Sequence, residues 1–221
     1  MELREAMTTL GTCRRFRPEP VPDEVLARAV DAARFAASGG NRQPVRYVVV
    51  RDARARRQLG EWYREPWLAY YERARAGGQG GHRVGGERAA RMLEEANRFA
   101  LAYGEHPAIV VVCARLSDLF ATDTGLDRLS IVGGASVYPT VQNLLLALRE
   151  QGVATAMTTL LCGAYDERVR ALLGIPDEFV SACQVVVGYP ERPFPRRLTR
   201  LPVGELLFSE RFGAPLEVHA P

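Results

Sequence analysis

The sequence predicts a single α/β or α+β domain. Four apolar segments rich in β-branched residues alternate with long segments that have helical spacing, and a helix precedes the first strand. The 221 residues are 47% hydrophobic and 25% charged, which suits one large domain with a real core. No segment repeats, and no Gly-x-Gly-x-x-Gly follows a strand, so a Rossmann dinucleotide fold is disfavoured.

The first half of the chain predicts three helices and two strands. Residues 24–37 have apolar residues at helical spacing, with Asp23 as the N-cap, and a strand follows over 45–52. Residues 53–77 are helical, but Pro66 predicts a break within them. A further helix is predicted over 87–104, and a buried strand over 106–114.

The second half predicts a buried central helix and two more strands. Residues 133–152 are mostly helical, and apolar side chains cover most of the circumference. Pro139 should start or kink this helix and Gly152 should end it. A strand or extended segment follows over 153–161, a short helix over 166–174 and the last strand over 181–190.

Composition excludes several classes of function. The net charge is 29 − 26 = +3 and the arginines are dispersed, which argues against nucleic acid. No apolar run reaches the roughly 18 residues of a membrane span, and the N-terminus lacks an apolar signal-peptide core. We therefore expect a cytoplasmic protein that does not bind a membrane. The four cysteines and three histidines lack metal-ligand spacing, so free thiols and no metal site are expected.

Three polar segments are candidates for chemistry. "TCRRF" (residues 12–16) places a hydroxyl beside two arginines, a pattern that can grip phosphate. Residues 38–43, "SGGNRQ", put six small or polar residues between a helix and a strand, more than a plain turn requires. "RRLTRLP" (residues 196–202) is a second basic cluster. Taken singly, each is more often a solvated surface segment; together they indicate an anion site.

In this order and spacing the segments resemble one family. "TCRRFRPEPVPDEVLARAVDAARFAASGGNRQPVRYVVV", "VQNLLLALREQGVAT" and "LLGIPDEFVSACQVVVGYPERP" resemble the FMN-dependent nitroreductases over roughly residues 8–202. The resemblance implies an α+β fold: a three-layer sandwich with a central mixed sheet flanked by helices, forming an intertwined homodimer. It also implies one domain over 1–221, with a variable lid insertion at about 62–100 and a C-terminal extension at about 191–221.

The resemblance also implies two FMN molecules at the dimer interface, each contacted by both chains. The cofactor-binding residues that it implies are Thr12, Arg14, Arg15, Ser38, Gly39, Asn41, Gln43, Thr158, Thr159, Leu160, Arg197 and Arg200. Among these, Arg14 and Arg200 match phosphate- or flavin-binding arginines, and Met157 to Cys162 match the segment beside flavin N5. Gln43 is expected at least to brace its loop.

Three positions depart from the family pattern. Leu10 stands where the family often has a first arginine; either Arg15 or Arg197 compensates for it, or the phosphate is held more loosely. Val45 stands where tryptophan is common, and Ala37 where proline is usual. These departures predict a flavin pocket of altered shape.

The activity implied by the resemblance is ping-pong transfer of hydride from NADH or NADPH, through flavin N5, to a small electron-poor acceptor such as a nitroaromatic, quinone or enone. No side chain is required as a catalytic group. Aromatic residues of the lid are candidates to stack on the acceptor, although helix packing is the slightly favoured explanation for any single one: Trp62, Tyr63, Trp67, Tyr70 and Tyr71. The alternatives are a dehalogenase or flavin-processing relative, or a flavin-binding protein without catalysis.

Overall fold

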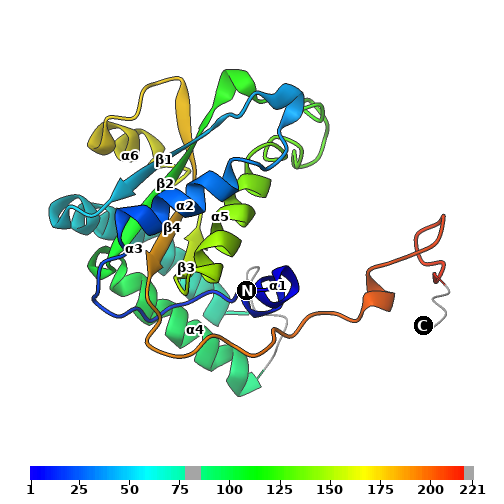
Figure 1. The fold of residues 1–221 in the computed structure, drawn as a ribbon, viewed down its shortest axis with the longest axis horizontal. Coiled ribbons are helices and arrows are strands. Elements are labelled where there is room, and N and C mark those ends of the chain that lie inside the picture. The colour runs from blue at the N-terminus through cyan, green and yellow to red at the C-terminus, as the bar shows by residue number, and fades with distance from the viewer. Residues whose placement is uncertain (78–85, 217–221) are drawn as a thin grey trace.

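The computed structural model describes residues 1–77 and 86–216 and arranges them around a four-stranded sheet (Figure 1). The strands are β1 (Val45–Val50), β2 (Ala108–Arg115), β3 (Ala154–Thr158) and β4 (Phe179–Gly188), in the order β1-β2-β4-β3. All three pairings between these strands are antiparallel. A parallel element comes from the N-terminal segment, where Thr12 forms an isolated parallel bridge with Thr155 of β3.

Helices cover both faces of the sheet, which confirms the predicted three-layer α+β fold. The helices α2 (Asp23–Ala33) and α5 (Tyr138–Glu150) pack on one face; α3 (Ala53–Arg75), α4 (Gly86–Leu101) and α6 (Asp166–Leu173) pack on the other. Successive side chains of β2 point to opposite faces of the sheet, so this strand contributes to a hydrophobic core on each face. Val110 packs against α2 and α5, and Val111 packs against α3, α4 and α6. Both valines are at most 2% exposed.

Most predicted elements are confirmed, but both ends of α2 and the predicted break at Pro66 were wrong. The Asp23 carboxylate pairs with Arg51 rather than capping α2, and Pro22 is the N-cap. The α2 helix ends at Ala33, whose carbonyl accepts a 2.7 Å hydrogen bond from the Thr140 hydroxyl. Pro66 lies inside α3 and does not break it. Buried aromatic residues on both sides of this proline hold the two halves of α3 against one core: Tyr63, Trp67 and Tyr71.

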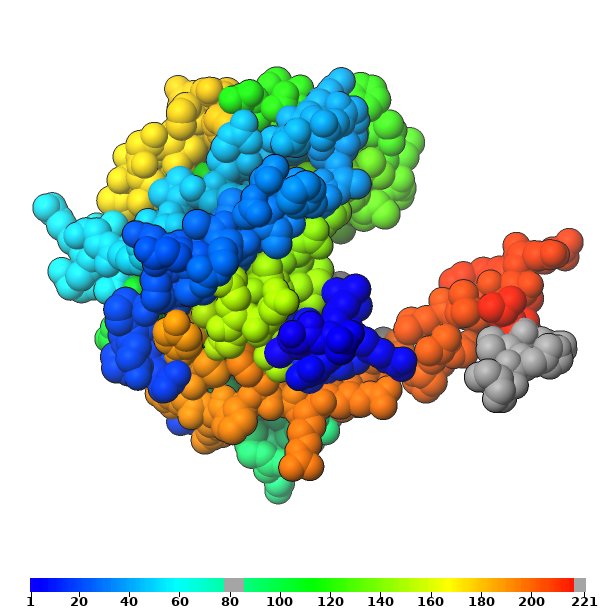
Figure 2. All heavy atoms as spheres, in the orientation of Figure 1, coloured from blue at the N-terminus to red at the C-terminus, as the bar shows by residue number. Residues whose placement is uncertain are grey.

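The N-terminal helix α1 (Leu3–Thr9) was not predicted. Residues far away in the chain stabilise it: Leu198 N donates to Thr8 O at 2.8 Å, and Arg149 Nε donates to Thr9 Oγ1 at 3.0 Å. Short 3₁₀ turns complete the fold: η1 (Gly39–Asn41), η2 (Tyr103–Glu105), η3 (Leu116–Asp118) and η4 (Val203–Glu205). Past α1, the C-terminal segment projects from the body of the molecule as an arm (Figure 2). No helix within residues 1–77 and 86–216 has the length and apolar character needed to cross a membrane.

A close backbone contact fixes where α3 lies. A Cβ added at Gly60 would lie 2.8 Å from Gly104 N, and one added at Gly104 would lie 2.6 Å from Arg56 O. Both obstacles are backbone atoms, so neither can move aside as a flexible side chain can. The two glycines therefore let α3 cross η2 at short range, and they position the half of α3 that carries the aromatic residues.

We predict that Gly60→Ala destabilises the protein by about 1–3 kcal/mol through overpacking. In an unhindered helix the same change would stabilise it by up to about 1 kcal/mol. Urea unfolding measures the difference, with the exposed helix position Ala69→Gly as the matched control for helix propensity alone. A Gly60→Ala protein more stable than the wild type would contradict the close contact.

Candidate functional site

Residues 12–17 form an extended strap that crosses the end of the sheet. Cys13 N donates to Thr155 O of β3 at 2.8 Å, and Arg17 N donates to Tyr189 O just after β4 at 2.8 Å. Between them, the Phe16 side chain is 9% exposed and belongs to the core. Backbone bonds at both ends and a buried anchor therefore fix the position of Arg14.

Arg14 lies where two cavities meet. It is half-buried and lines both of them, as does Thr12. Among the described residues, the Arg14 side chain has no hydrogen-bond partner and no ion-pair partner. Burial lowers the pKa of its guanidinium, an effect opposed chiefly by the charge of Glu95. Since guanidinium groups stay protonated in proteins, Arg14 offers a fixed positive charge to a ligand.

The larger cavity, of about 700 Å³, has a basic wall. Five arginines line it, from the strap, from α4 and from the segment after β4: Arg14, Arg15, Arg91, Arg192 and Arg200. The structure thus brings Arg200 to the same cavity as Arg14, as predicted. Arg197 is not among the residues lining it; it lines an adjoining hollow beside α1 that shares Leu198 and Arg200 with the larger cavity.

The C-terminal segment closes this cavity near the departure at Leu10. A Cβ on Gly11 would lie 3.2 Å from Leu198 Cδ2. Phe194 is fixed by the Arg149 guanidinium, which lies 3.8 Å from the centre of its ring. The two contacts hold the chain that leads to Arg200 against the strap.

The smaller cavity, of about 250 Å³, combines the end of β3 with aromatic side chains. Thr158, Thr159 and Leu160 line it, together with Tyr63, Trp67, Tyr70 and Phe99. The Thr158 hydroxyl lies 3.1 Å from the Tyr63 hydroxyl and accepts a 3.4 Å hydrogen bond from Leu160 N. Burial raises the pKa of Tyr63 to about 12, so this phenol is neutral at physiological pH.

The five candidate lid aromatics divide into two groups. Tyr63, Trp67 and Tyr70 line the smaller cavity, whereas Trp62 stacks on Tyr165 at 6.3 Å and Tyr71 donates to Glu94. Trp67 Nε1 also donates to Asn97 Oδ1 at 2.9 Å. The contacts to Glu94 and Asn97 tie α3 to α4 as one unit. Residues 78–85 of the predicted lid lie outside the described residues.

The polar loop 38–43 lies apart from both cavities. It lines a third hollow of about 200 Å³ that shares no residue with the other two. Its turn η1 lies at the opposite end of the molecule from α1 (Figure 1). The backbone φ is +60° at Gly40, +53° at Asn41 and +49° at Gln43. Left-handed conformations at two non-glycine residues mark a backbone under strain, which is common at functional sites.

Comparison with known proteins identifies the fold family. The model of the nitroreductase family matches residues 11–189, most of the chain. The chain belongs to the nitroreductase family. A protein of Thermus thermophilus named NADH dehydrogenase is 30% identical over 222 residues, covering 92% of this chain and 93% of that protein.

Other members of the nitroreductase family are also similar. An iodotyrosine deiodinase of Thermotoga neapolitana is 29% identical over 189 residues, covering 84% of this chain and 87% of its own. Rat iodotyrosine deiodinase 1 is 27% identical over 86% of this chain, which spans 63% of the rat protein's length.

Among solved structures, a nitroreductase with bound FMN from Desulfitobacterium hafniense matches with a TM-score of 0.61 at 25% identity. The match covers 90% of this chain and 95% of that one. An iodotyrosine deiodinase bound to FMN and 3-iodo-L-tyrosine matches in fold, with a TM-score of 0.69 at 24% identity over 96% of this chain and 100% of its own.

Sequence reasoning missed several residues that this nitroreductase fold brings to the cavities. Glu95 and Arg91 come from α4, and Arg192 and Phe194 follow β4. Of these, Arg192 alone belongs to a segment that resembles the family, and the distance of all four from the strap in sequence hides the contact. No sequence motif includes Asp123, although this residue supports the polar loop.

Asp123 organises the segment that holds the polar loop. Its carboxylate is 5% exposed and accepts hydrogen bonds from Ile131 N at 2.8 Å and Ser130 Oγ at 2.7 Å. Farther along the same segment, Ser136 Oγ accepts from Gly39 N at 3.0 Å. The Ile131 amide is the largest of the hydrogen-bonding effects that lower the pKa of Asp123 from 3.8 to about 2.

We predict that Asp123→Asn lowers the stability of this protein at neutral pH. A lowered carboxyl pKa stabilises the folded state above the unfolded pKa, and this contribution disappears as the pH falls through the folded value. The stability difference from wild type should therefore narrow between pH 3.8 and about 2. Urea unfolding over a pH series measures it; a difference that does not change with pH would contradict the role of the Asp123 charge.

Proposed function

We propose that this protein is an FMN-dependent oxidoreductase that uses NADH or NADPH to reduce a small electron-poor acceptor, such as a nitroaromatic, quinone or enone. The observation that supports it best is the position of Arg14. A half-buried cation with no polar partner among the described residues lies at the junction of a basic cavity and an aromatic one. Such a junction suits a ligand with an anionic end and a flat ring.

The residues present fit FMN. The basic cavity is lined by several arginines, and charge-assisted hydrogen bonds from arginine are the usual means of holding a phosphate. The smaller cavity places the end of β3 opposite aromatic side chains, an arrangement that leaves a flat space for a planar ring beside β3. We assign Arg14 and Arg200 to the phosphate end, and Thr12 to the ribityl chain beside it.

The segment from Met157 to Cys162 is assigned to the flavin ring. When bound, FMN supplies the electron-transfer chemistry at ring atom N5. Thr158, Thr159 and Leu160 line the smaller cavity. The hydrogen bond between Tyr63 and Thr158 fixes the position of the Thr158 hydroxyl.

The lining of the smaller cavity favours an aromatic acceptor without a strong positive charge. Its described residues include Arg14 but no carboxylate. A zwitterionic amino acid would find no acidic partner for its ammonium group among them. We assign Tyr63, Trp67 and Tyr70 to stacking on the acceptor, and residues of about 62–100 to the lid that selects it.

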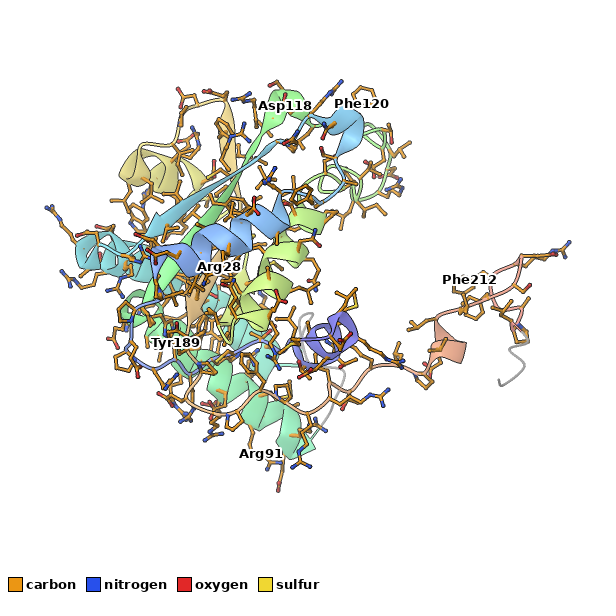
Figure 3. All side chains as sticks on the ribbon, in the orientation of Figure 1. Arg28, Arg91, Asp118, Phe120, Tyr189 and Phe212 are labelled. Atoms are coloured by element: carbon orange, nitrogen blue, oxygen red, sulfur yellow. The ribbon has the colours of Figure 1, made fainter. Side chains whose placement is uncertain are left out.

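We further propose that the working unit is a homodimer. Large apolar side chains are exposed at two separated places, on the arm and on the loop after β2, and Figure 3 labels Phe212 and Phe120 there. Phe212 is 96% exposed and Phe120 79% exposed, which is typical of surfaces that a partner covers. In such a dimer the C-terminal extension, about 191–221, embraces the second copy; its residues 217–221 lie outside the described residues.

The dimer also gives the polar loop a role. Ser38 and Gln43 line a hollow that shares no residue with either cavity at Arg14, and Gly39 and Asn41 belong to the same loop. We propose that they contact the FMN held mainly by the other copy. Gln43 braces this loop, because its side-chain amide donates to Asn41 Oδ1 at 3.2 Å and its backbone N donates to Ser38 Oγ at 3.1 Å.

Dehalogenation is the second candidate. Relatives at 27% and 29% identity are named iodotyrosine deiodinases. The absence of a carboxylate among the described residues of the smaller cavity argues against an iodotyrosine substrate. Halide release from a halogenated tyrosine, without NAD(P)H-dependent reduction of quinones or nitroarenes, would favour this candidate. Slow loss of the reduced flavin in air would instead indicate a flavin-processing enzyme.

We predict that Arg14→Ala weakens FMN binding at least about tenfold, because a charge-assisted bond in a half-buried site is lost. Fluorescence quenching during titration of the apoprotein with FMN measures the affinity. Arg28→Ala is the control for net charge, since Arg28 is exposed on α2 away from the cavities. Equal FMN affinity in the two variants would remove Arg14 from the site.

We predict that the purified protein shows a flavin visible spectrum, which bleaches when NADH or NADPH is added without oxygen. Addition of a quinone or nitroarene should restore the absorbance. A protein that keeps its spectrum but does not bleach is a flavin-binding protein and not an oxidoreductase. A colourless protein that takes up no FMN would refute the proposed function.

A further inference from the structure

A carboxylate lines the cavity that we assign to a phosphate. Glu95, from α4, is the acidic residue among the described residues around the basic cavity, where it lies with Arg14 and Arg200. Its side chain is 36% exposed. A negative charge in the wall of an anion site opposes binding. The cavity can therefore hold a phosphate well only if this charge is neutralised.

Two arginines engage both oxygens of Glu95. Arg15 Nε donates to Oε2 at 3.0 Å and Arg15 Nη2 donates to Oε1 at 2.8 Å, which is a bidentate pair. Arg98 Nη1 donates to Oε1 as well, at 3.0 Å. Arg15 comes from the strap and Arg98 from α4, one turn after Glu95. The Nε–Nη2 edge of the Arg15 guanidinium is therefore already used by Glu95.

Unlike Arg15, Arg14 has no carboxylate within ion-pair distance among the described residues. The charge of Glu95 acts on Arg14 more strongly than any other charge around it. Without Arg15, the freed carboxylate would be attracted to Arg14 and would compete with a phosphate for it. The two adjacent arginines thus have different partners available, one a carboxylate of the protein and the other a ligand.

We infer that Arg15 supports FMN binding indirectly: with Arg98 it neutralises Glu95, so that Arg14 and Arg200 remain available to the FMN phosphate. This inference rests on the proposed function and changes the role expected of Arg15 from phosphate ligand to positioning residue. It also explains how the cavity tolerates a carboxylate. The effect should be confined to ligands with a phosphate, because it acts through charge.

The test is a double-mutant cycle on FMN affinity, measured by titration of the apoproteins. We expect Arg15→Ala to weaken FMN binding about tenfold, the effect of one unpaired charge in a partly exposed site. Adding Glu95→Gln to Arg15→Ala should restore FMN affinity to within about threefold of the wild type, because the opposing charge is gone. Riboflavin, which lacks the phosphate, should bind all variants within about twofold of the wild type.

Arg98→Ala is the matched control. Arg98 pairs with the same carboxylate but is not among the residues lining the cavity, and it is 59% exposed. Its loss should weaken FMN binding in the same direction by about two- to threefold, and Glu95→Gln should abolish the effect. Glu95→Gln alone should bind FMN at least as tightly as the wild type. These two variants keep the inference testable even if Arg15→Ala folds poorly.

The outcomes separate the inference from the proposed function. If the wild type binds FMN but the double variant stays as weak as Arg15→Ala, Arg15 contacts the phosphate directly and the inference is wrong. Weaker FMN binding by Glu95→Gln alone would also overturn it. If the wild type binds no FMN at all, the proposed function fails, and the inference fails with it.

Discussion

The site depends on the strap of residues 12–17, which is bonded at one end to β3 and at the other to the segment after β4. The bonds from Cys13 N to Thr155 O and from Arg17 N to Tyr189 O are both 2.8 Å long. They place a half-buried arginine between a basic hollow and an aromatic one. Burial without a partner is unfavourable for a cation, so the strap holds Arg14 in a position that a bound anion would stabilise.

The aromatic side of the site is held by packing between distant elements. The glycine contact between α3 and η2 sets the position of α3, and bonds to α4 fix Trp67 and Tyr71. Tyr63 stacks on Tyr103, with ring centroids 4.1 Å apart, and reaches Thr158 at the end of β3. The smaller cavity is therefore preorganised by the core, which is how proteins keep a binding geometry at low entropic cost.

Much of the fold could be predicted from the sequence, because its signals are local. The strands are apolar β-branched runs, Pro139 lies in the first turn of α5, and Gly174 ends α6 with a φ of +64°. The helix α1 could not be predicted, since Leu198 and Arg149 stabilise it from far away in the chain. Pro66 was misleading for the same reason: the packing that compensates for it is tertiary.

The candidate site was predictable where residues match a family motif and not where the fold alone brings them together. Arg14 and Arg200 line one cavity, as expected, but Arg197 does not. The partner of Arg15 is 80 residues away, so no motif could show that its guanidinium is engaged. The polar loop 38–43 was expected beside the same flavin and lies in a separate hollow, which a second copy of the chain would reconcile.

We propose that each FMN site takes Arg14 from one copy of the chain and the polar loop from the other. Co-expression of differently tagged Arg14→Ala and Asn41→Gly chains gives mixed dimers; glycine keeps the left-handed backbone at residue 41, where φ is +53°. Each mixed dimer then contains one intact site and one doubly altered site, so we expect about one bound FMN per mixed dimer, while both parent dimers are depleted. Mixed dimers as poor in FMN as their parents would contradict the shared site.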